Sequence, residues 1–164
     1  QASAALIESL SDKNSNIRYH AARALGQIRA EKAVEPLITM LQEESGSLFY
    51  AAATALGQIG SLKALDHLIE SLDQPDYWDR RAVVSSLGEL GSEKAVDPLL
   101  NILKEENLNV HVKREIMVAF LKIGSKKTGS ALRKALSDDD AEVRLYAGEA
   151  LKRLSAGKGN NNQI

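Results

Sequence analysis

Aromatic and arginine side chains gather in one short segment, Tyr77-Trp78-Asp79-Arg80-Arg81, directly after Pro75-Asp76. The segment holds the only tryptophan of the 164-residue chain. Aromatic and arginine residues together are typical of protein-interface hot spots, because they bury a large area and still pair with carboxylates. The Pro-Asp pair predicts a turn that leads into a helix. The pattern therefore favours recognition of another molecule over bond-making chemistry.

Residue patterns for catalysis and for metal binding are missing from the sequence. There is no Gly-rich phosphate loop and no Ser/His/Asp set. The chain has no cysteine, which excludes disulfides and thiolate chemistry. The three histidines, His20, His67 and His111, lie in widely separated segments. We therefore expect no metal, no cofactor and no enzymatic activity.

Composition and charge limit the class of protein further. Apolar residues make up 44% and charged residues 26%, which is typical of a folded globular chain. A net charge of −1 gives no overall field that would attract nucleic acid or an anionic membrane. No apolar run approaches the length of a membrane span, and no signal-peptide pattern is visible, so we expect a cytoplasmic protein by default. Because the sequence begins with Gln1 and not with Met, we expect a fragment or a processed form.

A repeat positions these side chains. The stretch Ala24-Leu25-Gly26-Gln27-Ile28 returns four times, at spacings of 31, 31, 33 and 31 residues. A fixed period of this size indicates a stacked repeat architecture. The returning stretches are Ala55–Ile59, Ser86–Leu90, Ala119–Ile123 and Ala150–Leu154.

Each repeat is predicted to form two helices. In the second repeat, Val34, Leu37, Ile38 and Leu41 have the spacing of one apolar helix face. The second helix of the first repeat is expected at about 17–28, with an apolar stripe that runs from Ile17 to Ile28. Glycines are expected to end these second helices in a left-handed conformation. They are Gly60, Gly91 and Gly124.

A polar residue precedes a cation by six positions at the start of most second helices. We expect the polar side chain to cap the second helix and the cation to reach the same turn of the next repeat, which would fix how adjacent repeats stack. The alternative is that these are ordinary charged side chains, exposed to solvent near a helix start. Glu43 with Phe49 breaks the pattern. The pairs are Asp12 with Arg18, Gln74 with Arg80, Asn107 with Lys113, and Asp138 with Arg144.

The repeats differ at the ends of the chain and in one loop. We expect the fourth repeat to have a longer loop at 104–109, because it carries two extra residues. Gly129 and Arg133 replace apolar residues in the fifth repeat, which predicts a polar cap. Because the N-terminal repeat lacks such polar residues, we expect that an earlier repeat is missing or that the chain associates with itself through this repeat. The expected repeats are 1–29, 30–60, 61–91, 92–124 and 125–154, followed by a disordered tail at 155–164.

The segments IRYHAARALGQI, AVEPLITML and AEVRLYAGEALKRL resemble HEAT repeats. The short period is similar to that of the HEAT-like repeats in phycobilisome lyases, and the resemblance covers about residues 3–154. It implies an all-α fold, a right-handed α-solenoid of about five two-helix repeats. It also implies that the first helices lie on the convex side and the second helices on the concave side, where such proteins bind partners.

The residues that point away from the core stripe of the second helices are the expected binding residues. We expect Tyr50, Arg81 and Arg114 to form one row across adjacent repeats, and Trp78 and His111 to form the next. The alternative is that the aromatic residues only pack against the adjacent repeat. The expected partner-binding residues are Tyr19, His20, Arg23, Tyr50, Tyr77, Trp78, Arg81, His111, Arg114 and Tyr146.

Three functions are compatible with this architecture. We favour a non-enzymatic scaffold that binds another protein on its concave face. A subunit similar to a bilin lyase, which would handle a tetrapyrrole chromophore, is implied by the family resemblance alone. Nucleic-acid binding is less favoured, because Glu89, Glu115, Glu142 and Glu149 interrupt any basic stripe.

Overall fold

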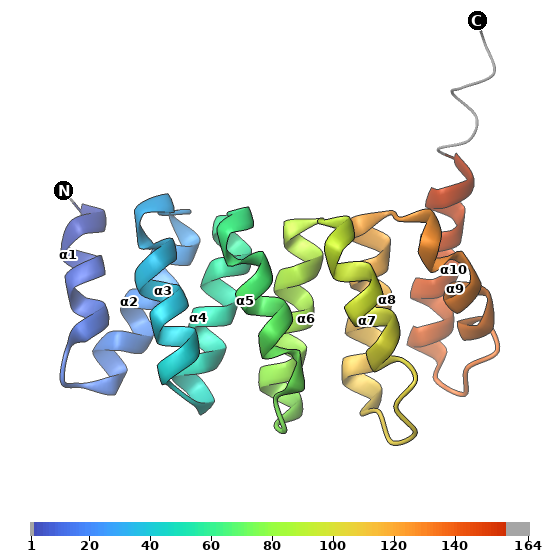
Figure 1. Ribbon diagram of the computed structural model, residues 1–164, viewed down its shortest axis with the longest axis horizontal. Coiled ribbons are helices and arrows are strands. Elements are labelled where there is room, and N and C mark those ends of the chain that lie inside the picture. The colour runs from blue at the N-terminus through green and yellow to red at the C-terminus, as the bar shows by residue number, and fades with distance from the viewer. Residues whose placement is uncertain (1, 157–164) are drawn as a thin grey trace, which may run out of the picture.

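The computed structural model describes residues 2–156, and over that range it contains ten α-helices and no strand. The helices form five consecutive pairs, with short 3-10 turns beside them (Figure 1). The first helices of the pairs are α1 (Ala2–Glu8), α3 (Val34–Glu43), α5 (Leu65–Glu70), α7 (Val96–Ile102) and α9 (Gly129–Ala135). The second helices are α2 (Ser15–Gln27), α4 (Gly46–Ile59), α6 (Tyr77–Leu90), α8 (Val110–Ile123) and α10 (Ala141–Ala156). The prediction of an all-α fold built from helix pairs is confirmed.

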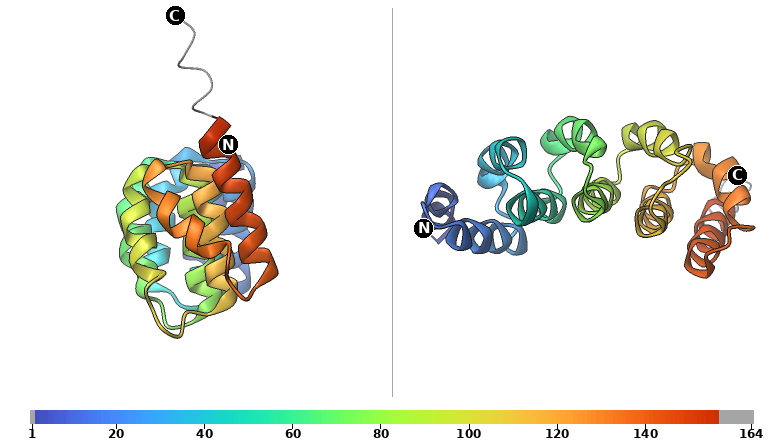
Figure 2. Two further views of the ribbon diagram at one scale, coloured as in Figure 1. Left: turned by 90° about the vertical axis from the view of Figure 1, so that its right-hand side faces the viewer. Right: turned by 90° about the horizontal axis from the view of Figure 1, so that it is seen from below.

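The pairs stack into a solenoid of two layers. Figure 2 shows the first helices in one layer and the second helices in the other, with the second helices on the inner side of a shallow arc. The second helices of neighbouring pairs pack directly against one another, whereas the first helices meet their neighbours mainly through the 3-10 turns. The second helices therefore line the concave side, as the family resemblance implied.

The core lies between the two layers and repeats with the sequence. The leucines at equivalent positions of the first helices α3, α5, α7 and α9 are fully buried. They are Leu37, Leu68, Leu99 and Leu132. The expected apolar stripe on α2 is wrong at its two ends, because Ile17 is 43% exposed and Ile28 is 54% exposed. Among the described residues no earlier helix pair packs against α2, so these two side chains lack the neighbour that covers their counterparts.

Local hydrogen bonds fix where the second helices begin and end. Four of the five have side-chain N-caps, Asn14, Asp76, Asn109 and Asp140, which accept backbone N–H groups of the first turn, whereas Ser45 before α4 forms no such bond. These caps lie two residues after the polar residues that we expected in this role, which corrects that prediction. At the C-terminal ends, Gly60, Gly91 and Gly124 have φ values of 78°, 63° and 69°, so the predicted left-handed glycines are confirmed.

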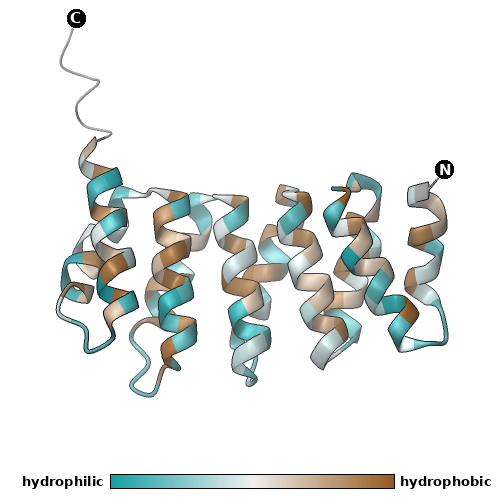
Figure 3. Ribbon diagram, turned by 180° about the vertical axis from the view of Figure 1, so that it is seen from behind, coloured by the Kyte–Doolittle hydropathy of each residue, from teal (hydrophilic) through white to brown (hydrophobic). Residues whose placement is uncertain are grey.

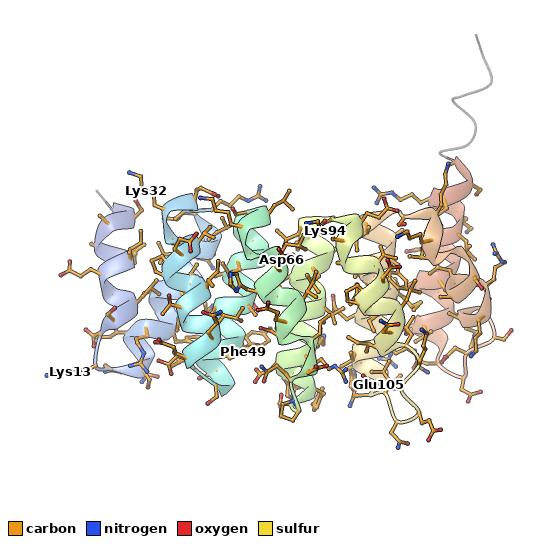
Figure 4. The ribbon with its side chains drawn as sticks, viewed as in Figure 1. Lys13, Lys32, Phe49, Asp66, Lys94 and Glu105 are labelled. Atoms are coloured by element: carbon orange, nitrogen blue, oxygen red, sulfur yellow. The ribbon has the colours of Figure 1, made fainter. Side chains whose placement is uncertain are left out.

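Cations at the lower edge of the stack join adjacent repeats, as the six-residue pattern predicted. Three of the four cations reach an acidic residue in the turn of the next repeat, whereas Arg144 donates to the Asp138 and Asp139 carbonyls of its own turn. The position that lacks a cation holds the buried Phe49 (Figure 4). The ion pairs are Arg18–Glu44 at 3.0 Å, Arg80–Glu105 at 2.7 Å and Lys113–Asp138 at 2.9 Å. At the upper edge, Ser61 donates to Glu31 at 2.8 Å and Ser125 donates to Glu93 at 2.7 Å. The junction at Phe49 is therefore held by an upper hydrogen bond and by apolar packing.

Small residues let the second helices approach closely on the inner side. A methyl group added at Gly57 would lie 2.8 Å from Ser86 Cα, and one added at Gly88 would lie 3.0 Å from Ala119 Cα. Ser86 also donates a buried hydrogen bond to the Ala53 carbonyl of α4, at 2.8 Å. The backbones of α4 and α6 are therefore in near contact.

The ends of the stack and the longest loop depart from the regular repeat. Arg133 is exposed at the C-terminal end, but Leu136 and Leu145 are also 44% and 56% exposed there, so that end is only partly polar. Ser155 and Ala156 continue α10, and the rest of the expected disordered tail lies outside the described residues. The extra residues of the fourth repeat lengthen the loop between α7 and α8 (Figure 1), and Glu105 in that loop pairs with Arg80. Within the described range, no helix combines the length and apolar character needed to cross a membrane.

Candidate binding face

A groove of about 440 Å³ runs across the concave side over α2, α4 and α6 and reaches α8. Its wall is mainly polar, and its aromatic residue, Tyr50, is 40% exposed. Beside it, a hollow of about 290 Å³ extends along α2 and α4 to Tyr19 and Arg23. The side chains that the two hollows share are Gln27, Tyr50, Thr54 and Gln58. Four of the ten expected binding residues, Tyr19, Arg23, Tyr50 and Arg81, thus line one continuous surface.

Arg81 is held in place at the edge of the groove by two neighbours. Its Nε donates to Glu115 Oε2 at 3.1 Å, and its guanidinium carbon lies 5.7 Å from the centre of the Trp78 ring. The carboxylate and the ring fix the plane of the guanidinium, which remains 42% exposed. Trp78 itself is 51% exposed. The two side chains present a flat, accessible surface at the start of α6.

Tyr77, and not Trp78, forms the link to His111. The Tyr77 ring lies 4.9 Å from the Trp78 ring and 6.0 Å from the His111 ring, and it is half-buried against the core. The ring contact to His111 is thus made by Tyr77, and the expected row of Trp78 and His111 stays a prediction. Tyr77 supports this edge of the face from beneath.

Arg114 belongs to a different cluster from Tyr50 and Arg81. Its Nε donates to Asp140 Oδ1 at 2.9 Å, and it also pairs with Glu142. The hydrogen bond from Arg114, followed by the backbone N–H of Val143, holds the pKa of Asp140 far below its usual range. The expected row of three is wrong at Arg114, whose charge is already neutralised by the turn before α10.

The remaining expected residues lie outside the groove. His20 is exposed and packs edge-on against Tyr19, with ring centres 5.3 Å apart. His111 is exposed at the start of α8, beyond Tyr77. Tyr146 is half-buried and packs against the core on α10, as in the alternative in which the aromatic residues only pack within the stack. Figure 3 views the molecule from behind, so that the second helices face the reader, and shows hydrophilic and hydrophobic residues mixed along these helices.

The groove contains one arginine that the sequence pattern did not single out. Arg29 lines it and follows α2 with φ 51°, at the position that Gly60, Gly91 and Gly124 occupy in later repeats. The Arg29 and Ala30 N–H groups donate to the Gly26 and Leu25 carbonyls, so Arg29 is the left-handed residue of this helix end. A side chain there costs roughly 1 kcal/mol relative to glycine. In the sequence, the signal for this residue is that arginine stands at position 29, where the next three repeats have Gly60, Gly91 and Gly124.

The charges of the groove are unevenly paired. Both carboxylates that line it have partners, Glu115 with Arg81 and Glu89 with Lys122 at 2.7 Å. Among residues 2–156, no acidic side chain pairs with Arg23 or Arg29. Arg23 instead lies 5.6 Å from the centre of the Tyr19 ring. The surface over α2 therefore carries two cations that are free to bind anions.

Asp79 is a buried acid on the same helix as Trp78 and Arg81. It is 7% exposed and takes a position that Leu48, Val112 and Val143 fill in other repeats. Burial raises the pKa of the Asp79 carboxyl, and the neighbouring Asp76 raises it further, while the Gly46 backbone N–H acts in the opposite direction. Within the described part of the chain, no cluster of histidine and acidic residues has the arrangement of a metal site.

Comparisons with known proteins connect this architecture to a family. The chain has 26% sequence identity to a chain in the complex of CpcE and CpcF of phycocyanin lyase from Nostoc sp. PCC7120, with a TM-score of 0.84. The match covers 94% of this chain, which spans 65% of the length of that lyase chain. A designed armadillo repeat protein in complex with the peptide (KR)4 is similar in fold at 20% identity, with a TM-score of 0.68 and coverage of 91% of this chain and 80% of that one. No curated protein sequence matches the chain.

A family model adds the decisive comparison. The model of HEAT repeats matches residues 3–87 and 70–152, which together include all five helix pairs. The chain belongs to the HEAT-repeat family.

Proposed function

We propose that the chain is a scaffold that binds another protein on the concave face formed by its second helices. The observation that carries the proposal is the groove beside Tyr50, where aromatic and arginine side chains are exposed on the concave side of the stack. Tyr50, which lines the groove, and Trp78, which is exposed beside Arg81 at its edge, are the proposed anchors, since tyrosine and tryptophan are enriched among the residues that supply most of the affinity in protein interfaces. The similarity to a chain of a two-protein lyase complex supports the same class of function.

The test separates binding from stability. Truncation of an anchor costs about 2–4 kcal/mol of binding, which is about 30- to 1,000-fold in affinity. Tyr50→Ala and Trp78→Ala should change the free energy of unfolding by less than about 0.5 kcal/mol, because both side chains are exposed. Proteins retained from an extract of the native host by the wild-type chain should be lost with both variants. Leu62→Ala is the matched control, because Leu62 is 62% exposed in the turn before α5, outside the groove.

The two possible readings of the aromatic residues predict opposite results. If Tyr50→Ala and Trp78→Ala lower the free energy of unfolding by several kcal/mol (about 3 kcal/mol or more for a core aromatic) and leave partner retention unchanged, these side chains are core residues. The concave-face proposal would then be wrong.

A second candidate function is a role similar to that of a bilin lyase subunit. The observation that favours it is the likeness to the phycocyanin lyase complex, at 26% identity over 94% of this chain. Addition of a free bilin to the protein should then shift the visible absorption of the pigment, and Tyr50→Ala should remove the shift. An unchanged spectrum at excess protein would leave the protein scaffold as the better proposal.

A further inference from the structure

We infer that the N-terminal half of the concave face recognises an acidic segment of its protein partner, and that Arg23, Arg29 and Arg81 are the residues that select it. The inference rests on the proposed function and adds the chemistry of the partner. A carboxylate-rich segment is favoured because the two carboxylates in the groove are already paired, whereas Arg23 and Arg29 have no acidic partner among the described residues.

The position of Arg29 is the strongest argument. Three later repeats end their second helix with a left-handed glycine, and the first repeat ends it with an arginine in the same conformation at φ 51°. Stability alone would favour glycine there, because a side chain in this region is strained. Backbone strain in proteins is concentrated at functional sites, and this strained residue lines the groove.

The three guanidinium groups surround polar side chains that suit a peptide. Arg23 comes from α2, Arg29 from the residues just after it, and Arg81 from α6, with α4 between them. Gln27, Gln58 and Thr54 line the floor, and their side chains form no hydrogen bond within residues 2–156. Amide side chains can donate to a peptide carbonyl and accept from a peptide N–H. Tyr50 adds an apolar contact at the centre of the groove.

A nucleic acid fits this surface less well than an acidic peptide. Phosphates would meet the carboxylates of Glu89 and Glu115, which lie in the same wall as Arg81. A peptide with separated carboxylates can contact the arginines and leave these two positions to backbone or neutral side chains. Charge complementarity therefore selects an acidic protein segment.

The experiment measures fluorescence anisotropy of short labelled peptides added to the whole chain. A peptide of alternating Glu and Ser should bind, and its affinity should fall as salt increases. Peptides of alternating Gln and Ser or Lys and Ser, and a single-stranded oligonucleotide, should bind at least about tenfold more weakly. No binding of the Glu-Ser peptide up to millimolar concentration, or tighter binding of the oligonucleotide, would overturn the inference.

Variants assign the effect to the groove. Arg29→Gly should weaken binding of the Glu-Ser peptide about tenfold, while it raises the melting temperature, because glycine relieves the left-handed strain. Arg23→Gln should weaken binding by a similar factor. Lys94→Gln is the matched control, because Lys94 is an exposed cation on the upper edge, outside the groove (Figure 4). Equal peptide affinity in Arg29→Gly, Arg23→Gln and the wild type would contradict the inference.

The outcome is separable from that of the proposed function. If Tyr50→Ala abolishes partner retention and the two arginine variants do not, the concave face binds its partner without reading acidic residues. If none of these variants affects retention, the concave-face proposal itself fails.

Discussion

The close contact between the second helices predicts the order of stability in a series of glycine-to-alanine variants. In an exposed helix interior this change would stabilise the chain by about 1 kcal/mol, because glycine is a poor helix former. At Gly57, however, the new methyl group would lie 2.6 Å from Ser86 Oγ and 2.7 Å from Ser86 Cβ. Ser86 is buried and cannot swing aside without losing its hydrogen bond to the Ala53 carbonyl.

The magnitude follows from three contributions. Overpacking of a close contact costs about 1–3 kcal/mol, and loss of the Ser86 hydrogen bond costs about 1 kcal/mol. The helix-propensity gain offsets only about 1 kcal/mol of this. We expect Gly57→Ala to destabilise the chain by about 1–3 kcal/mol, which corresponds to a decrease of several degrees in melting temperature, at about 2–4 °C per kcal/mol.

Two other glycines provide internal controls. Gly88→Ala would place its methyl 3.0 Å from Ala119 Cα, so a small shift suffices and the change should be close to neutral. Gly148→Ala meets no atom nearer than Leu136 Cδ2 at 3.8 Å and should stabilise the chain by about 1 kcal/mol. Urea unfolding followed by helical circular dichroism measures the series. If Gly57→Ala is as stable as Gly148→Ala, the helices do not approach as closely as described.

Three further predictions concern side chains that join the repeats. Arg114 holds the pKa of Asp140 below its unfolded value of about 3.9, so this pair stabilises the fold above that pH, and its contribution is lost as the pH falls further. In thermal melts between neutral pH and a pH of about 3, the melting temperature of Arg114→Gln should therefore fall less than that of the wild type. Phe49→Ala should lower the free energy of unfolding by about 3–5 kcal/mol, because Phe49 is buried. Arg80→Ala, at the equivalent position of the next repeat, should lower it by less than about 1 kcal/mol. Similar losses for the two variants in urea titrations would contradict the burial of Phe49. Asp79→Leu should raise the free energy of unfolding at neutral pH by roughly 1–2 kcal/mol. Because the pKa of the Asp79 carboxyl is raised in the folded state, this gain in stability should shrink as the pH is lowered through that pKa. A gain that does not depend on pH in urea titrations would argue against this account.

The repeat carried most of the fold information in the sequence. Local rules placed the helices, the left-handed Gly60 and the cations that reach the next repeat, because each depends on a few neighbouring residues. The rules failed where a side chain depended on a missing neighbour. Ile17 and Ile28 have the pattern of core residues, yet they are exposed because no earlier helix pair covers them among the described residues.

The candidate site was less predictable, because its contacts cross between repeats. Tyr50 and Arg81 were placed on one surface by their repeat positions alone. Arg114 has an equivalent position, but Asp140 in the following turn draws it away, and periodicity does not report such a pair. Arg29 could not be predicted, because a left-handed residue after a helix is usually glycine, and the φ of Arg29 is known only from the structure.

The unequal packing of the two layers has a mechanical consequence. On the concave side the backbones of α4 and α6 are already in near contact, so the arc cannot close further at this junction without overlap of atoms. On the convex side the first helices meet their neighbours mainly through short turns and not through direct helix packing, so they can move closer together when the curve flattens. We therefore expect the solenoid to resist an increase in its curvature more strongly than a decrease. A bulky partner would be accommodated by flattening of the curve, and the groove would widen rather than clamp.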